Sequence, residues 1–146
     1  MVYSFLNVSC FIAGPGIGAN LAAGAAAAEE GITLEASEDK NVMTIGADGK
    51  GQHSLVASDA ATATIRLLKT SPVNAQLMVA YDLQTISSAL HGLNVMTITD
   101  SGRGDISVLT SCAFKKKPTL TYAKEGGMME WTFDVIQAST VLGAGQ

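Results

Sequence analysis

The sequence predicts a mainly β fold, an antiparallel β-sandwich or partly closed barrel with one flanking α-helix, and three observations carry this prediction. Apolar and polar residues alternate through about eight short segments. Turn sequences such as Asp48-Gly49 separate these segments at the spacing of antiparallel hairpins. One stretch, beginning at Ser71, has helical spacing after a helix-start signal. The length of 146 residues fits a single domain over residues 1–146.

The first strand is expected at residues 3–13, where alternate residues are apolar. One face of this strand carries Leu6, Val8, Cys10 and Ile12. Residues 14–31 are rich in glycine and alanine, and we predict a long functional loop there. The two cysteines, Cys10 and Cys112, lie within expected strands, and we predict buried, reduced thiols.

The middle of the chain is expected to form four strands, with a hairpin turn at Asp48-Gly49, followed by the helix. Strands are predicted in residues 32–35, 42–47, 52–57 and 62–69. Ser71 is the expected N-cap, and Pro72 occupies the first turn, where its missing N–H costs nothing. The helix is expected to end between Asp82 and Thr85, or after His91 at Gly92.

The C-terminal part is expected to hold four more strands. They are predicted in residues 94–99, 106–114, 119–123 and 128–135, with turns in residues 100–105 and 124–127. Residues 138–146 are small and are predicted to form a weakly ordered tail.

No pattern in the chain specifies catalysis or a bound cofactor. Residues Gly14 to Ala19 match G-x-G-x-x-A, but a dinucleotide fold needs repeated strand-helix-strand units, and the rest of the chain alternates. His53, His91 and the two cysteines lack metal-ligand spacing. Adjacent His53 and Ser54 would point to opposite faces of a strand. We therefore expect a protein that is not an enzyme and has no cofactor or metal; a nucleotide enzyme built on Gly14 to Ala19 remains an alternative.

Charge is scarce and unevenly distributed. The chain has 9 basic and 13 acidic residues, only 15% charged residues in all, and a net charge of −4. This acidic balance disfavours sequence-specific nucleic-acid binding, and the low charge suggests that something other than water covers part of the surface. The acidic block consists of Glu29, Glu30, Glu35, Glu38 and Asp39. The basic block consists of Lys115, Lys116, Lys117 and Lys124. We hypothesise a salt-sensitive contact between these blocks on neighbouring copies.

The first 28 residues contain no charged side chain. They also lack the basic start of a signal peptide, and recurring glycines interrupt any spanning helix, so we expect neither a membrane segment nor a membrane partner. An export signal is the alternative for this segment.

Three long ordered blocks carry a family resemblance. Residues 27–55, 65–78 and 114–133 resemble the tail tube proteins of contractile-tailed bacteriophages, and the similarity extends from Tyr3 to about Phe133. The resemblance implies a β-sandwich subunit that assembles into hexameric rings, whose sheets join into a ring-shaped barrel. It implies stacking of these rings into the inner tail tube of the virion, after assembly in the host cytoplasm. Sheath, tape-measure and baseplate proteins would be partners, phage DNA would pass through the channel, and no catalytic residue is implied.

Two sets of residues follow as candidates for this function. Acidic side chains in a channel would repel passing phosphates, and the candidates are Glu35, Glu38, Asp39, Asp48, Glu130 and Asp134. Candidates for contacts between subunits or rings are the two charge blocks, residues 47–52 and the glycines of the predicted loop, Gly14, Gly16 and Gly18. The N-terminal strand is the alternative for contacts between stacked rings. The alternative function is a monomeric β-sandwich module that binds a carbohydrate or protein through the glycine-rich loop and is stabilised by it.

Overall fold

The fold is mainly β, as predicted, with a single α-helix among the described residues. The structure is a computed structural model and describes residues 3–4, 7–21 and 27–143. Its elements in chain order are β1 (Val8–Gly14), β2 (Ile17–Asn20), β3 (Ala27–Ala36), β4 (Asn41–Ile45), β5 (Gly51–Leu55), β6 (Ala61–Leu68), α1 (Val73–Ile86), β7 (Asn94–Asp100), β8 (Asp105–Phe114) and β9 (Met128–Val141).

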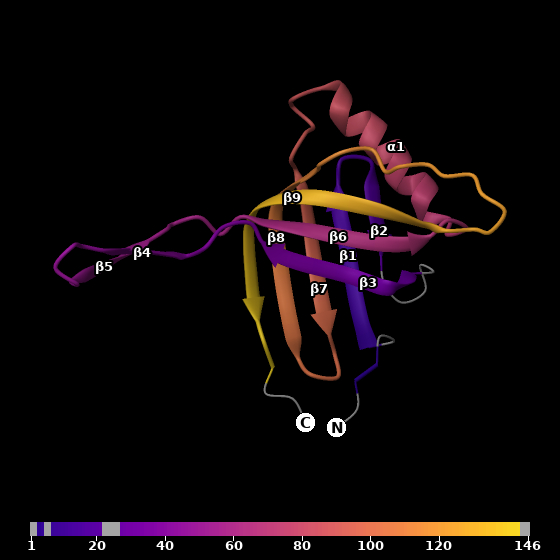
Figure 1. Cartoon of the computed structure of the whole chain (residues 1–146). Helices are drawn as coiled ribbons and strands as arrows, with labels where there is room; N and C mark the ends of the chain where they lie inside the picture. Colours follow the sequence, from indigo (N-terminus) through magenta and orange to yellow (C-terminus); the bar gives the residue numbers. More distant parts are fainter. Residues whose placement is uncertain (1–2, 5–6, 22–26, 144–146) are drawn as a thin grey trace.

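Seven strands form one antiparallel sheet in the order β2-β1-β7-β8-β9-β6-β3. The long strand β9 belongs to both halves of this sheet, because its first half pairs with β6 and its second half with β8. Figure 1 shows β1, β7 and β8 running crosswise to β3, β6 and the start of β9, with α1 at one end of the fold. The sheet therefore bends around its own core, and β2 and β3 remain as its edges.

The bend lies where β8 and β9 shift their core-facing positions together. In β8, two outward residues instead of one separate the buried Leu109 and Cys112, and in β9 two separate the buried Val135 and the half-buried Ala138. The pairing register between the two strands stays continuous. Ser111, with φ of 54°, is a non-glycine residue in the left-handed region. In β7, one residue between Asn94 and Met96 faces two residues in β8, as in a β-bulge.

The core lies inside this bend and is closed at one end by α1. Trp131 and Phe133 are fully buried, and the ring of Phe114 packs between them and Tyr81 of the helix, with centroid distances of 5.8, 4.7 and 5.7 Å. The indole Nε1 of Trp131 donates to Oδ1 of Asn74 at 3.0 Å, which ties the first turn of α1 to β9. Both cysteines are buried and free, as predicted.

A buried pair of amides joins the helix to the sheet. Gln84 and Asn94 are fully buried and hydrogen-bond each other reciprocally at 2.9 and 2.7 Å. Gln84 also donates to the carbonyl of Pro15, and Asn94 to the carbonyl of Cys112. This network fixes α1 against three segments of the sheet without leaving a buried polar group unpaired.

Most predicted strands are confirmed, but the predicted loop at residues 14–31 is wrong in its described part. Pro15 and Gly16, with φ of 79° at the glycine, form the turn of a tight hairpin between β1 and β2. The strand β3 already begins at Ala27. Residues 22–26 lie outside the described residues. Short glycine-containing strands resemble loops in composition, and here their strand partners decide the conformation.

Two further predictions near the C-terminus are wrong. Residues 119–123 form no strand and pair with no described strand, although β9 has no partner on its β8 side before Phe133. The predicted weakly ordered tail instead continues β9 to Val141, since the long strand β8 offers pairing partners as far as Ile106. Residues 144–146 lie outside the described residues.

The predicted helix is confirmed with small differences at both ends. Its N-cap position is Pro72, and Oγ of Ser71 accepts a hydrogen bond from the N–H of Val73 at 3.3 Å. The helix ends at Ile86, one residue beyond the first of the two predicted ends, and no helical residue lies at His91.

Candidate functional site

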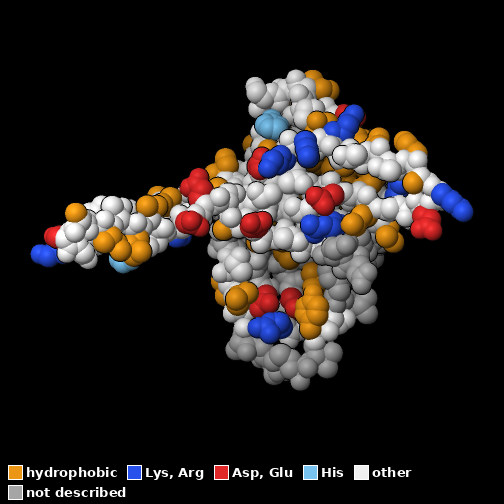
Figure 2. Space-filling model, viewed as in Figure 1, with side chains coloured by type: hydrophobic (Ala, Val, Ile, Leu, Met, Phe, Trp, Pro, Cys, Tyr) orange, Lys and Arg blue, Asp and Glu red, His pale blue; other side chains and the backbone are white. Residues whose placement is uncertain are grey.

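The strands β3, β6 and the first half of β9 share one outward surface, which we call the charged face. Their inward residues, such as Ala63, Ile65 and Phe133, are buried, so the intervening residues point away from the core. The charged face consists of Thr33, Glu35, Thr62, Thr64, Arg66, Leu68, Met128, Glu130, Thr132 and Asp134. Figure 2, in the view of Figure 1, shows acidic and basic side chains over β3, β6 and β9.

Three of the six predicted acids meet on the charged face. Glu35 and Asp134 both pair with Thr62, from opposite sides, so the two carboxylates belong to one row across the sheet. Glu130 lies farther along β9 and forms an ion pair with Nε of Arg66 at 3.3 Å. Arg66 also donates to Oγ1 of Thr33 at 2.9 Å. The arginine is thus paired with one of the three carboxylates.

The other three predicted acids lie elsewhere. Glu38 and Asp39 are exposed in the connection from β3 to β4. Asp48 lies in the turn between β4 and β5, where its Oδ1 accepts from the N–H of Lys50 at 3.1 Å. Alternation in the sequence could place Glu35, Glu130 and Asp134 on strand faces, but pairing between distant strands brought them to the same one.

The strands β4 and β5 form a separate two-stranded sheet that projects from the body, and we call residues 40–56 the arm. The arm strands pair only with each other, and Figure 1 shows them extending away from the seven-stranded sheet. The arm begins where Lys40 pairs with Asp59 at 2.8 Å and accepts the N–H of Val56 at its carbonyl. The predicted contact segment 47–52 is the tip of this arm.

The second outward surface, which we call the uncharged face, lies on the other half of the sheet. It consists of the outward residues of β1, β7, β8 and the second half of β9: Ser9, Phe11, Ala13, Val95, Thr97, Thr99, Ile106, Val108, Thr110, Gln137, Ser139 and Val141. None of these positions carries a charge, and Phe11, Ile106 and Val141 are exposed. Sequence reasoning missed this face, although the scarcity of charge signalled it.

The predicted basic block lies in the connection between β8 and β9. Lys115 follows β8 directly, and its N–H donates to the carbonyl of Thr132 at 2.9 Å, beside the charged face. Lys116, Lys117 and Lys124 are exposed, and none of the four lysines forms an ion pair with a described residue. The backbone of Glu29 and Glu30 lies in β3, while their side chains are outside the described part of the structure.

The predicted glycine contacts differ in their surroundings. A β-carbon at Gly14 would overlap Oδ1 of buried Asn94, and one at Gly16 would lie 2.5 Å from Cδ2 of Leu83. A β-carbon at Gly18 would be 3.7 Å from the Phe11 ring. Gly14 and Gly16 therefore serve close packing inside the subunit, and the segment is a hairpin and not a nucleotide-binding loop.

Replacing Gly14 with alanine is expected to lower the free energy of unfolding by about 1–3 kcal/mol, because the new methyl group must displace the amide of Asn94 from its hydrogen bonds. The control is Gly18→Ala, which meets only ordinary van der Waals contact and should change stability by less than about 0.5 kcal/mol. Urea denaturation of both variants measures the difference. Equal stability of the two variants would contradict this packing role.

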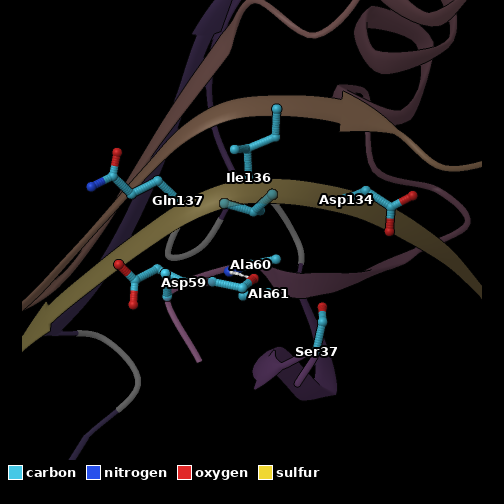
Figure 3. Close-up of a pocket in the computed structure, with 10 residues that line it drawn as sticks. Ser37, Asp59, Ala60, Ala61, Asp134, Ile136 and Gln137 are labelled. Atoms are coloured by element: carbon cyan, nitrogen blue, oxygen red, sulfur yellow. Dashed lines mark hydrogen bonds between the residues drawn. The ribbon is translucent and has the colours of Figure 1, made fainter. Parts of the chain in front are cut away.

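A cleft of about 610 Å³ lies where β9 bends, between the arm and the charged face. Its lining is mostly small residues, and its carboxylates are Asp59 and Asp134, which Figure 3 shows apart, with Ala60 and Ala61 between them. Asp59 is already paired with Lys40. Within the described residues, no group of three side chains could hold a metal, and the cleft lining has no histidine beside Ser37 or Ser58. The cleft lining therefore contains no serine–histidine pair.

These surfaces define a class of protein: a subunit of a larger assembly. Within the described residues, the two edge strands β2 and β3 have one partner strand each, the arm strands pair only with each other, and no position of the uncharged face carries a charge. No helix in the described residues is long and apolar enough to span a membrane.

Comparison with family models identifies the assembly. The chain belongs to the bacteriophage PhiTE tail tube protein family, whose model matches residues 1–143. The fold is similar to that in a cryo-EM structure of the anti-feeding prophage cap, a tube-terminating cap, with a TM-score of 0.52, 8% sequence identity, and coverage of 92% of this chain and 88% of that one. Comparison with curated proteins gives no match. The chain is thus a structural protein of a phage tail.

Proposed function

We propose that this chain forms the inner tube of a contractile tail, as hexameric rings that stack around a channel for the genome. Family membership supports a tube. The observation that supports ring formation is that β2 and β3, the first and last strands of the seven-stranded sheet, each have an unpaired edge. Edge pairing between neighbours would close the ring and remove the unpaired N–H and C=O groups that an edge exposes. Assembly would take place in the host cytoplasm, with sheath, tape-measure and baseplate proteins as partners.

Electron microscopy of the purified chain tests this function directly. Rings or tubes are expected over a range of protein concentrations. A folded protein that stays a compact monomer at every concentration and salt level would contradict the proposal.

The charged face is our candidate for the channel lining. Its carboxylates, Glu35, Glu130 and Asp134, outnumber its single arginine. Its other side chains are four threonines, with two apolar residues, Leu68 and Met128, at one end. Such a surface is hydrated and weakly repels phosphate, so DNA would pass without sticking. The uncharged face would instead expose more apolar surface to the water of the channel, which the hydrophobic effect disfavours: Phe11, Val95, Ile106, Val108 and Val141, against Leu68 and Met128 on the charged face.

Reversing the charge of this lining should make assembled tubes retain DNA. In the Glu35→Lys/Asp134→Lys variant, a cationic row would replace the acidic one, and short double-stranded DNA should co-sediment with tubes at 50 mM salt and be released at 300 mM. Wild-type tubes and an Asp48→Lys variant, changed at the arm tip, should bind at least tenfold less. Equal DNA binding by the double variant and the Asp48→Lys variant would argue against a position of Glu35 and Asp134 in the channel. Loss of tubes only in the double variant would place these two residues at a subunit interface.

The basic block is our candidate for contacts between subunits. Lys116, Lys117 and Lys124 are exposed without an ion pair to a described residue, and exposed Glu38 and Asp39 lie at the base of the arm. A contact between these groups on neighbouring copies would make assembly salt-sensitive.

A further inference from the structure

The arm has one apolar face and one polar face. Its register places Met43 and Ile45 of β4 on the same side as Leu55 of β5. These three side chains are 60%, 59% and 85% exposed. The opposite side carries Val42, Thr44, Gln52 and Ser54. The apolar side also holds Asn41 and His53, whose side chains hydrogen-bond each other at 3.0 Å.

The body of the same chain does not cover this apolar face. The arm strands pair with no other described strand, and Figure 1 shows the arm pointing away from the body. Figure 2 shows hydrophobic side chains along its visible side. A two-stranded hairpin alone is marginally stable in water, and burial of its apolar side would stabilise it.

The uncharged face has the matching properties. Phe11 of β1, Val95 of β7, and Ile106 and Val108 of β8 expose apolar side chains, with threonines and serines between them. The uncharged face spans four strands, β1, β7, β8 and β9, which are spaced about 4.8 Å apart. Its width across the strands is close to the length of a five-residue arm strand, about 16 Å. Neither surface carries a charge at these positions, so contact between them would bury no unpaired ion.

We propose that the apolar side of the arm packs on the uncharged face of a neighbouring copy. This inference rests on the proposed function and specifies which surfaces meet. The two surfaces are different parts of one chain, so the contact is heterologous and propagates from copy to copy, closing into rings or continuing along a helix. Since the contact is apolar, it is expected to persist at high salt, unlike the lysine contact above.

Disulfide trapping tests the contact in assembled tubes. The Leu55→Cys/Val108→Cys variant should form intermolecular crosslinks under mild oxidation at pH 8, seen as a ladder on non-reducing gels. The control, Val42→Cys/Val108→Cys, changes the opposite side of the arm and should crosslink at least fivefold less. The native thiols give little background, because burial raises the pKa of Cys10 to about 12 and that of Cys112 to about 11.

Charge substitutions give a second readout that does not depend on disulfide geometry. Leu55→Lys or Val108→Lys should prevent tube formation while leaving the circular dichroism spectrum unchanged, and Val42→Lys should assemble normally. Tubes formed by all three lysine variants, with no excess crosslinking over the control pair, would overturn this contact and leave the proposed function standing. A folded wild-type chain that never assembles would overturn both.

Discussion

Replacing Trp131 with alanine should lower the free energy of unfolding by about 3–5 kcal/mol, the range for large aromatic residues removed from a core. Trp131 is fully buried and packs against Phe114. Its loss also leaves Oδ1 of Asn74, a buried residue, without the indole donor. Asn74 donates in turn to the carbonyl of Leu68, so the substitution loosens the junction between β6 and α1.

Chemical denaturation followed by far-ultraviolet circular dichroism measures this loss. The chain should be dilute enough to remain unassembled, because assembly would add stability that depends on concentration. Tyr122→Ala is the control: Tyr122 is 84% exposed and contacts Nζ of Lys69 through its ring, so its removal should cost less than about 1 kcal/mol. Similar losses for the two variants would contradict the central place of Trp131 in the core.

Removing the arm should abolish assembly and leave the body folded. The carbonyl of Lys40 accepts the N–H of Val56 at 2.8 Å, so the chain can be closed there by replacing residues 41–55 with Asn-Gly, the sequence typical of a two-residue hairpin turn. The body loses no strand pairing, and its stability should change by less than about 1 kcal/mol, as expected away from the core. Sedimentation should show a monomer at concentrations where the wild type forms tubes.

The matched control is a second closure that keeps the arm strands and changes only their tip, with residues 46–50 replaced by Asn-Gly. This variant retains Met43, Ile45 and Leu55 and should still assemble if the apolar side of the arm makes the contact. Tubes from the armless chain would show that the arm is dispensable. Failure of the tip variant alongside the armless one would shift the contact to residues 46–50.

The comparison between sequence and structure separates local from long-range information. Alternation located most strands, and Asp48-Gly49 located the arm turn, because these signals act within a few residues. Residues 14–20 were predicted as loop although they pair as a hairpin, and residues 119–123 were predicted as strand although they pair with no described strand. Both errors concern partners, which a local pattern does not contain.

The candidate site divides in the same way. The alternation of apolar and polar residues predicts that the side chains of Glu35, Glu130 and Asp134 point away from the core. The family resemblance made them candidates for the lining of a channel. That they share a face follows from the pairing of β6 with β3 and β9, which are far apart in the sequence. The uncharged face went unseen because its residues come from four separate strands.

The sequence by itself determined a mainly β subunit, its one helix, its buried thiols and its place in a phage tail tube family. Only the tertiary structure showed that the sheet bends at Ser111 and that β2 and β3 are its edges. It also showed that the apolar side of the arm is exposed and not covered by the body of the chain. The physical reason is that successive side chains alternate between the two sides of a strand, so a local pattern can sort residues into two sides. Which side faces the core, the solvent or a neighbouring strand depends on strand pairing and on the bend of the sheet.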